Sequence, residues 1–269
     1  MIFFIDQTGQ TISLNKTPQR IISVVPSQTE LLFDLGLNEE ITGITKFCVH
    51  PADWFKTKTR IGGTKQLNIE LIQQLNPDLI IANKEENVKE QIEVLQKHFP
   101  VWISDVNNLE DAYEMIEQVG LITDKQNAAK NIVITIRNNF ARLQTHNLPT
   151  GQASSKRSTC CYLIWQNPYM TIGGDTFISS MLDAAGFANI FQDSRRYPKV
   201  TIEQLQSVNC ELLFLSSEPF PFRQKHIEAL QKQLPETKMI LVDGELFSWY
   251  GSRMLKAPAY FKQLQQQIR

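Results

Sequence analysis

Cys48 and His50 are the pair of side chains in this sequence best suited to metal chemistry, since a single residue separates them on a predicted loop. A thiol and an imidazole are soft to borderline ligands that suit transition metals. His50 could offer a neutral imidazole to an open coordination position of a metal, could contact a ligand without coordinating it, or could have a structural role. Two residues do not complete a metal site, and no second Cys/His cluster follows nearby in the sequence. All three interpretations stay open.

Aromatic and polar side chains are concentrated in the segments that follow predicted strands. In parallel α/β folds ligands lie beyond the carboxyl ends of the strands, so these segments form the expected binding surface. The candidate ligand-binding residues are Ser27, Gln28, Phe47, His50, Trp54, Thr64, Lys65, Trp165, Tyr169, Met170, Arg196, Tyr197, Phe247, Trp249 and Arg253. Rings with scattered polar groups suit a large, flat, amphipathic ligand, on which Trp165, Tyr197 and Trp249 would stack. The alternative is that the rings close the top of each lobe.

Three arginines lie in the same loops and could meet acidic or phosphate groups of a ligand. Arg195, Arg196 and Arg253 carry planar guanidinium groups, which bind carboxylate or phosphate oxygens in pairs. A surface salt bridge is an equally good interpretation for each of them.

The sequence lacks the motifs of common enzyme classes. It has no Gly-x-Ser-x-Gly elbow, no His-Glu-x-x-His, no P-loop and no Gly-x-Gly-x-x-Gly. Asp193, Asp243 and Glu245 lie near the same loops without catalytic spacing, and the adjacent Gly173 and Gly174 are weak evidence for a phosphate loop. We therefore expect a binding protein with no catalytic residues and no intrinsic cofactor. A cytosolic enzyme or metal chaperone is the less favoured alternative.

Composition is that of a packed protein with no strong electrostatic bias. Of 269 residues, 42% are hydrophobic and 20% charged, and the net charge of −1 gives no footprint for nucleic acid. No apolar run approaches the roughly 18 residues that span a bilayer. The N-terminal residues 1–6 are typical of a strand rather than of a signal peptide, so either an export signal has been removed or the protein stays in the cytosol. We expect a monomer in which Cys160, Cys161 and Cys210 are ordinary buried thiols.

An imperfect internal repeat organises the chain. Residues 68–82 and 201–215 share the same sequence pattern, which predicts a helix followed by a strand. Each begins with a good N-cap residue, Asn68 or Thr201, followed by Ile and Glu in the first helical turn. An acidic residue then precedes an apolar run of strand length.

Other elements recur in the same order. Residues 30–36 and 180–186 are each predicted as a helix that closes on glycine, and the strand predicted at 101–105 has a counterpart at 239–243. Alternating strands and helices favour an α/β fold with two Rossmann-like lobes and parallel sheets. The expected divisions are residues 1–120, an interlobe helix within 121–150, and residues 151–269.

A long amphipathic helix is predicted between the halves, from Asp124 to His146. Its stripe consists of Ala129, Ile132, Ile136, Phe140 and Leu143, at spacings of three and four residues. At 1.5 Å per residue the helix would span roughly 35 Å. We expect it to act as a stiff spine beside a ligand cleft between the lobes, with residues 147–158 as the flexible entry to the second lobe.

The residues in several of these segments resemble those of the vitamin B12 and iron-siderophore binding proteins of ABC importers. The resemblance rests on residues 19–30, on Gly62-Gly63-Thr64 with 68–70 and 77–81, and on 189–191 with 201–203. It extends over nearly the whole chain and looks nearest to the cobalamin-binding branch.

The resemblance implies a periplasmic, non-enzymatic carrier that binds a cobalamin or an iron chelate between its lobes with little hinge motion. It also implies docking to the arginines of an ABC permease/ATPase complex through one surface glutamate on each lobe. The matching positions are Glu70 and Glu203, although a glutamate in a first helical turn also stabilises the helix dipole.

The family's cleft aromatics match less closely. The corresponding positions are His50, Thr64, Met170 and Tyr197, and only Tyr197 keeps such a ring. The transported ligand therefore stays open between a corrinoid, which is favoured, and an iron-siderophore or haem.

Overall fold

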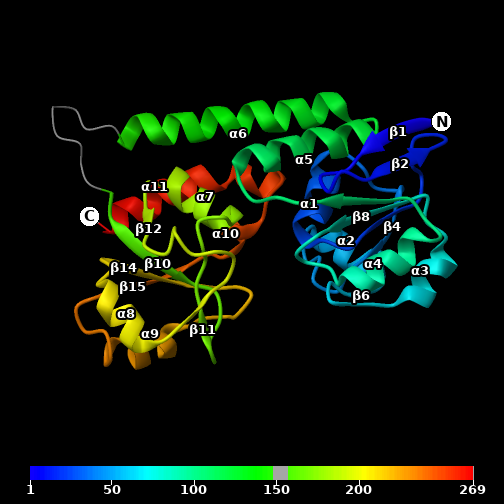
Figure 1. The fold of residues 1–269 in the computed structure, drawn as a ribbon. Helices are drawn as coiled ribbons and strands as arrows, with labels where there is room; N and C mark the ends of the chain where they lie inside the picture. The colour runs from blue at the N-terminus through cyan, green and yellow to red at the C-terminus, as the bar shows by residue number, and fades with distance from the viewer. Residues whose placement is uncertain (148–156, 269) are drawn as a thin grey trace. The chain divides into compact units, whose positions relative to one another are not determined.

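The computed structural model describes residues 1–147 and 157–268, except for the side chains of residues 144–147. The chain forms two compact α/β units (Figure 1). Unit 1 comprises Met1–Val106, Glu110–Thr135 and Tyr250–Arg253, and unit 2 comprises Asn107–Leu109, Ile136–Trp249 and Met254–Arg269. Residues 107–109 thus belong to unit 2 and residues 250–253 to unit 1, out of chain order.

Unit 1 is built on a parallel five-stranded sheet. The strand order is β5 (Thr59–Arg60), β4 (Ile41–Ile44), β3 (Ile21–Ser23), β8 (Leu79–Asn83) and β9 (Val101–Ser104). Strands β3, β8 and β9 are buried along their whole length, because helices cover both faces of a parallel sheet. Their side chains therefore form the core of unit 1.

Helices and two small hairpins complete unit 1. The helices are α1 (Pro26–Asp34), α2 (Ala52–Thr57), α3 (Ile69–Leu75), α4 (Lys89–Gln96) and α5 (Leu109–Ile122). The hairpins pair β1 (Ile2–Ile5) with β2 (Thr11–Leu14), and β6 (Gly62–Gly63) with β7 (Gln66–Leu67). The strand predicted at the N-terminus is thereby confirmed.

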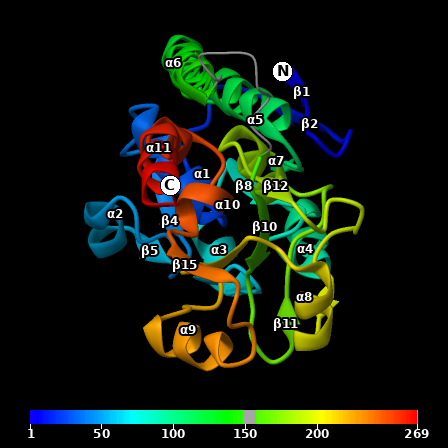
Figure 2. The ribbon, with the colours of Figure 1, turned by 90° about the vertical axis from the view of Figure 1, so that its left-hand side faces the viewer.

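Unit 2 is built on a parallel four-stranded sheet. The strand order is β12 (Ala188–Asn189), β10 (Thr159–Leu163), β14 (Leu212–Ser216) and β15 (Lys238–Val242). Its helices are α7 (Phe177–Ala184), α8 (Ile202–Val208), α9 (Gln224–Gln231), α10 (Glu245–Ser248) and α11 (Ala257–Ile268). Within this unit α7, α10 and α11 cover one face of the sheet, and α8 and α9 cover the other (Figures 1 and 2).

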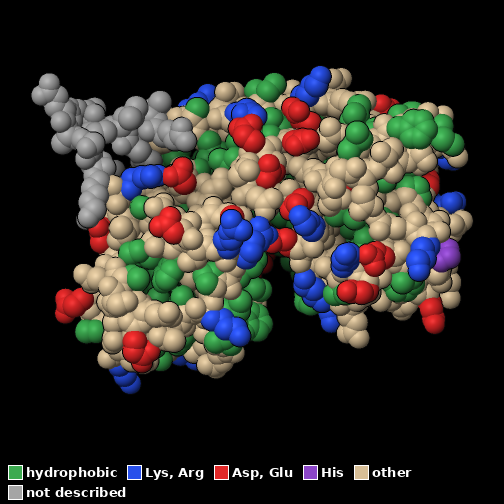
Figure 3. Space-filling view, viewed as in Figure 1, with side chains coloured by type: hydrophobic (Ala, Val, Ile, Leu, Met, Phe, Trp, Pro, Cys, Tyr) green, Lys and Arg blue, Asp and Glu red, His purple; other side chains and the backbone are tan. Residues whose placement is uncertain are grey.

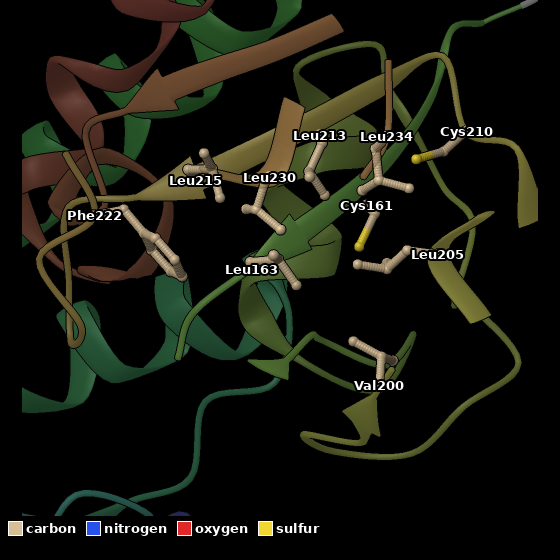
Figure 4. Packing of buried hydrophobic residues seen from close by; sticks show 10 residues of the cluster. All are labelled: Cys161, Leu163, Val200, Leu205, Cys210, Leu213, Leu215, Phe222, Leu230 and Leu234. Atoms are coloured by element: carbon tan, nitrogen blue, oxygen red, sulfur yellow. The ribbon is translucent and has the colours of Figure 1, made fainter. Parts of the chain in front are cut away.

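Alternating side chains of the unit 2 strands fill the two sides of its core. Cys161, Leu163, Leu213 and Leu215 point toward the side of α8 and α9, where they join a buried apolar cluster (Figure 4). That cluster also contains Val200, Leu205, Cys210, Phe222, Leu230 and Leu234. Cys160, Cys161, Cys210 and Cys48 are all buried and free, as predicted for the first three.

Helix α6 (Gln126–Asn147) confirms the predicted amphipathic stripe. Ala129, Ile132, Ile136, Phe140 and Leu143 are all buried. The first part of the helix, to Thr135, belongs to unit 1 and the part from Ile136 to unit 2. Most of the predicted flexible entry at 147–158 lies outside the described residues.

The internal repeat is present in detail. Helices α3 and α8 each have seven residues, an N-cap side chain that accepts a backbone N–H, and a left-handed asparagine at the C-cap. Asn76 and Asn209 adopt φ values of 46° and 45° there. Each helix leads to a fully buried five-residue strand, β8 or β14. The repeated sequence pattern therefore forms the same helix–strand structure in both units.

Among the described residues, no helix combines the length and apolar character needed to cross a membrane. On the face shown in Figure 3, acidic and basic side chains are interspersed in both units, in keeping with the net charge of −1.

Candidate ligand-binding site

Polar side chains are buried where the central strands of unit 1 end. Strand β3 leads into α1, whose first turn contains Ser27 and Gln28, both predicted ligand-binding residues. Ser27 is 2% exposed and Gln28 is fully buried. Gln28 Nε2 donates to Ser104 Oγ at the end of β9. These residues thus lie at the carboxyl edge of the sheet, where an α/β unit places its ligand contacts.

The loop after β4 separates the members of the Cys48–His50 pair. Cys48 is fully buried and its Sγ lies 3.1 Å from Thr29 Oγ1 and 3.2 Å from Thr45 Oγ1. Burial raises the pKa of this thiol, so Cys48 stays protonated and is a poor metal ligand. His50 is half-buried and Phe47 is 51% exposed, so both are better placed for ligand contact than Cys48.

Trp54 does not fulfil its predicted role. Its side chain is 2% exposed, its indole N–H donates to Asn38 Oδ1 at 3.0 Å, and its ring packs edge-on against Phe33. The ring anchors α2 to the rest of unit 1. This burial corrects the prediction that Trp54 contacts a ligand.

The hairpin of β6 and β7 presents Thr64 and Lys65 at its turn. Thr64 is half-buried and Lys65 is exposed, with its Nζ donating to the carbonyl oxygen of Glu85 at 2.6 Å. Gly62, at φ 102°, is required because a Cβ there would lie 2.4 Å from the carbonyl oxygen of Gln66. The hairpin's own backbone therefore explains this glycine, without any approaching ligand.

In unit 2, partly exposed aromatic rings lie past the end of β10. Trp165 is 41% exposed, and Tyr169 and Met170 are half-buried. Trp165 forms an isolated antiparallel bridge with Met170, and its ring meets that of Phe220 edge-on at 5.8 Å. Phe220 was not among the candidate ligand-binding residues, although it ends the segment that follows β14.

Arg196 and Tyr197 lie together on the loop between β12 and β13 (Lys199–Val200). Arg196 has φ 54° and its guanidinium lies 5.7 Å from the centre of the Tyr197 ring. Its Nη1 donates to Asn107 Oδ1 at 2.8 Å. Both side chains are half-buried, and Arg195 beside them is exposed.

The same loop accounts for the paired glycines that weakly resembled a phosphate loop. A Cβ at Gly173 would lie 2.3 Å from the carbonyl oxygen of Ser194, and one at Gly174 would lie 2.1 Å from that of Gln192. The close approach is made by the protein's own backbone, so these glycines carry no indication of phosphate binding.

Two further aromatic predictions need correction. Phe247 is fully buried among Tyr162, Phe214 and Phe261, with its ring centre 4.6 Å from that of Phe261. It belongs to the core of unit 2. Trp249, at 8% exposed, is buried beside it, so neither ring offers an open stacking surface.

Arg253 is also committed within the protein. Its Nε donates to Glu30 Oε2 at 2.7 Å, and both side chains are less than a tenth exposed. Glu30 lies in α1, so the ion pair ties the 250–253 segment into unit 1. Arg253 was predicted to contact an acidic group of the ligand, but its guanidinium instead pairs with Glu30.

Glu218 is a buried carboxyl that sequence reasoning did not single out. Ser248 Oγ donates to its Oε1 at 2.5 Å. Burial raises the pKa of Glu218, and the nearby Glu245 and Asp243 act in the same direction. Its position after β14, beside Ser216 and Ser217, was the available signal.

The two repeated glutamates are both exposed. Glu70 and Glu203 are each the second residue of their helix, α3 or α8. The pKa of Glu203 is lowered by hydrogen bonds from its own backbone and from Thr201, so it is ionised at neutral pH. Each unit thus carries an equivalent carboxylate on its surface.

No three His, Cys, Asp or Glu side chains come together as a possible metal site within the described part of the chain. A pocket of about 370 Å³ in unit 2 is lined by residues of α7, of β12 and of the segment after β12, among them Ser179, Asp183 and Asn189. Arg157 and Asp183 form an ion pair at its rim.

Sequence comparison identifies relatives over most of the chain. Residues 21–239 match the model of a family described as periplasmic binding protein. A vitamin B12-binding protein of Vibrio vulnificus (strain CMCP6) is 27% identical over 211 residues, which cover 77% of this chain and 74% of that protein.

Solved structures give the same result. A possible iron-binding, periplasmic solute-binding protein of Staphylococcus epidermidis is 26% identical, with a TM-score of 0.78 over 94% of this chain and 99% of that one. The periplasmic vitamin B12 binding protein of Vibrio cholerae shares the fold, with 24% identity and a TM-score of 0.75 over 93% and 99% of the two chains. With a family match over most of its length and two parallel α/β units of this fold, the chain belongs to the periplasmic binding proteins of the ABC importer type.

Proposed function

We propose that this protein captures a cobalamin or a related corrinoid outside the cytoplasm and delivers it to the permease of an ABC importer. The repeated pair of exposed glutamates, Glu70 and Glu203, carries the proposal of delivery. Two carboxylates at equivalent positions of two units match a partner that offers basic groups at two equivalent places. The curated relatives named as vitamin B12-binding proteins support the choice of ligand.

Each unit offers its own set of proposed ligand contacts. In unit 1 these are Ser27, Gln28, Phe47, His50, Thr64 and Lys65, and in unit 2 they are Trp165, Tyr169, Met170, Arg196 and Tyr197. The exposed ring of Trp165 offers stacking area for a flat macrocycle. Its edge-on contact with Phe220 holds the ring in place.

Ligand binding is tested by titrating the purified protein with cyanocobalamin, aquocobalamin, haem and two ferric siderophores, with tryptophan quenching and visible spectra as readouts. Tight binding of the two cobalamins alone supports the proposal. Preference for haem or a siderophore would instead favour the iron-compound carriers, a class that the structural relative from S. epidermidis brings into consideration. A spectral shift of aquocobalamin that disappears in His50→Ala would assign His50 as a cobalt ligand.

Delivery is tested by charge reversal. In cells that depend on this protein for corrinoid uptake, we expect Glu70→Lys with Glu203→Lys to abolish uptake while ligand binding is retained. Glu90→Lys with Glu228→Lys is a matched control, since both residues are exposed. Glu90 lies in the first turn of α4 and Glu228 in the middle of α9. Unchanged uptake in the Glu70/Glu203 double variant would contradict the docking role.

A further inference from the structure

A polar network joins the ends of three neighbouring strands in unit 1, β3, β8 and β9. Gln28 is the third residue of α1, which follows β3, while Asn83 ends β8 and Ser104 ends β9. All three side chains are at most 3% exposed. The network therefore sits at the carboxyl edge of the sheet, where the proposed binding surface of unit 1 lies.

The network fixes which way the Gln28 amide points. Asn83 Oδ1 accepts from the backbone N–H groups of Glu85 and Glu86, so Asn83 Nδ2 must be the group that donates to Ser104 Oγ, at 3.0 Å. The single hydroxyl proton of Ser104 goes to the carbonyl oxygen of Ala82. Ser104 Oγ can therefore only accept from Gln28, which directs Nε2 toward Ser104 and leaves Oε1 on the other side of the amide.

Gln28 Oε1 has no hydrogen-bond partner among the described residues, and the same holds for Oγ of the preceding residue, Ser27. Both atoms are buried. A buried acceptor without a donor is unfavourable, and native proteins rarely leave one in that state. Since the orientation of the amide is fixed, only a group that brings its own N–H or O–H can satisfy Oε1.

A short segment covers this part of α1. A Cβ on Gly251 would lie 3.5 Å from the carbonyl oxygen of Ser27 and 3.4 Å from Leu31, so the 250–253 backbone packs directly on the start of the helix. Ser252 Oγ in that segment is likewise buried without a partner among the described residues. Three of the buried polar atoms without a partner, Ser27 Oγ, Gln28 Oε1 and Ser252 Oγ, thus belong to the first turn of α1 and to the segment that packs on it.

We infer that Gln28 Oε1 and Ser27 Oγ receive a primary carboxamide of the transported compound, and that this pair selects for amide-bearing ligands. The inference rests on the proposed function and narrows its ligand class. A carboxamide has an N–H donor for Gln28 Oε1 and a C=O acceptor for the Ser27 hydroxyl. For the amide to reach this pair, the backbone at Gly251, which packs on Ser27, must shift.

The same pair disfavours the other ligands of comparable proteins. A carboxylate, such as a haem propionate, offers acceptors alone and would face the fixed oxygen of Gln28. The iron-binding oxygens of a hydroxamate are acceptors too. A corrin ring, whose edge carries several primary amides, supplies the required donor.

The experiment compares cyanocobalamin with the set of its monocarboxylate derivatives, in each of which one side-chain amide has been hydrolysed. For the wild-type protein we expect at least one derivative to bind about tenfold more weakly than cyanocobalamin, as when a buried polar group loses its partner. In Gln28→Met this ratio falls to near one. In Ser104→Ala the Gln28 amide is free to turn, so the ratio also falls although Gln28 is retained.

Gln96→Met serves as the control, since Gln96 lies in α4 and its amide bonds to Gln10 away from the network. It should keep the wild-type ratio. Equal melting temperatures of the variants show that the fold is intact. A ratio unchanged in both Gln28→Met and Ser104→Ala would overturn the inference and leave an internal water as the partner of Oε1. Failure of the wild-type protein to bind any corrinoid would overturn the proposed function itself.

Discussion

The carboxyl edges of the two sheets carry different types of side chain, although both units contain the same helix–strand repeat. In unit 1 the strand ends carry buried polar side chains, such as Gln28, Asn83 and Ser104, held by hydrogen bonds. In unit 2 they carry partly exposed rings, such as Trp165 and Phe220. Hydrogen bonds give direction, and rings give contact area. The two units therefore offer different types of ligand contact, although they share the same repeat.

The largest expected effect separates core rings from ligand-facing rings within unit 2. Phe247→Ala removes a fully buried ring that packs on Tyr162, Phe214 and Phe261, so it should lower the free energy of unfolding by about 3–5 kcal/mol. Urea denaturation measures the change. Trp165→Ala, by contrast, should change stability by less than about 1 kcal/mol, because the ring is 41% exposed. Equal losses in the two variants would break the distinction between core and surface rings.

The next effect concerns the buried charges of unit 1. Arg253→Met removes the guanidinium that pairs with the buried Glu30, and breaking such a pair costs about 3–5 kcal/mol. The double variant Glu30→Met with Arg253→Met should recover much of that loss, because no charge then stays buried. Thermal or urea unfolding of the three proteins gives the coupling. A single variant as stable as wild type would show that the pair is dispensable.

A smaller effect should appear in ligand affinity. Trp165→Ala should weaken corrinoid binding by about 30-fold, as expected for a central aromatic contact worth about 2 kcal/mol. Phe47→Ala removes an exposed ring of unit 1 and should weaken binding less. Isothermal titration measures both. Stronger dependence on Phe47 would place the main stacking area in unit 1 and reverse the comparison.

The smallest effect is a pH dependence in unit 2. His226 Nδ1 accepts the backbone N–H of Arg223 at 2.8 Å, and the pKa of His226 is lowered from 6.5 by burial and by the charges of Lys225 and Arg223. The unfolded chain then binds the proton more readily than the folded one. Stability contributed by neutral His226 should therefore fall as the pH drops below about 6.5 and level off below the lowered folded pKa.

Replacing this histidine checks the sign. His226→Gln should flatten the decline in unfolding free energy between pH 7.5 and 5.5 relative to wild type. Glu218 acts in the opposite direction, because its pKa is raised in the folded state and its contribution is lost as the pH rises. A decline of equal steepness in His226→Gln would assign the pH dependence to other groups.

The sequence predicted the elements well because their signals are local. N-caps at Asn68 and Thr201, glycine after α1 and α7, and the α6 stripe each depend on residues within a few positions of one another. The parallel sheets followed from the order of these elements, and the strand pairing confirms them. The family resemblance followed from the residues in several of these segments, and the match to the periplasmic binding proteins confirms it.

The side-chain predictions were less successful because burial depends on distant parts of the chain. Trp54, Phe247 and Trp249 have the composition expected of ligand-facing rings, yet each is buried. Arg253 pairs with Glu30, which lies more than two hundred residues earlier in the sequence, and no local sequence pattern predicts this pair. Gln28 was predicted as a ligand contact, but its orientation follows only from the contacts of Ser104 and Asn83 with their neighbours.

Residues 250–253 belong to unit 1 although they lie near the end of the chain, and this affects how the protein folds during translation. The sheet of unit 1 is complete once Ser104 has been made, yet Glu30 gains its cationic partner only when Arg253 emerges. Until then the nascent unit lacks the segment that supplies this ion pair. An N-terminal domain usually folds first during synthesis. Here the first-made unit reaches its final form only when nearly the whole chain has been translated.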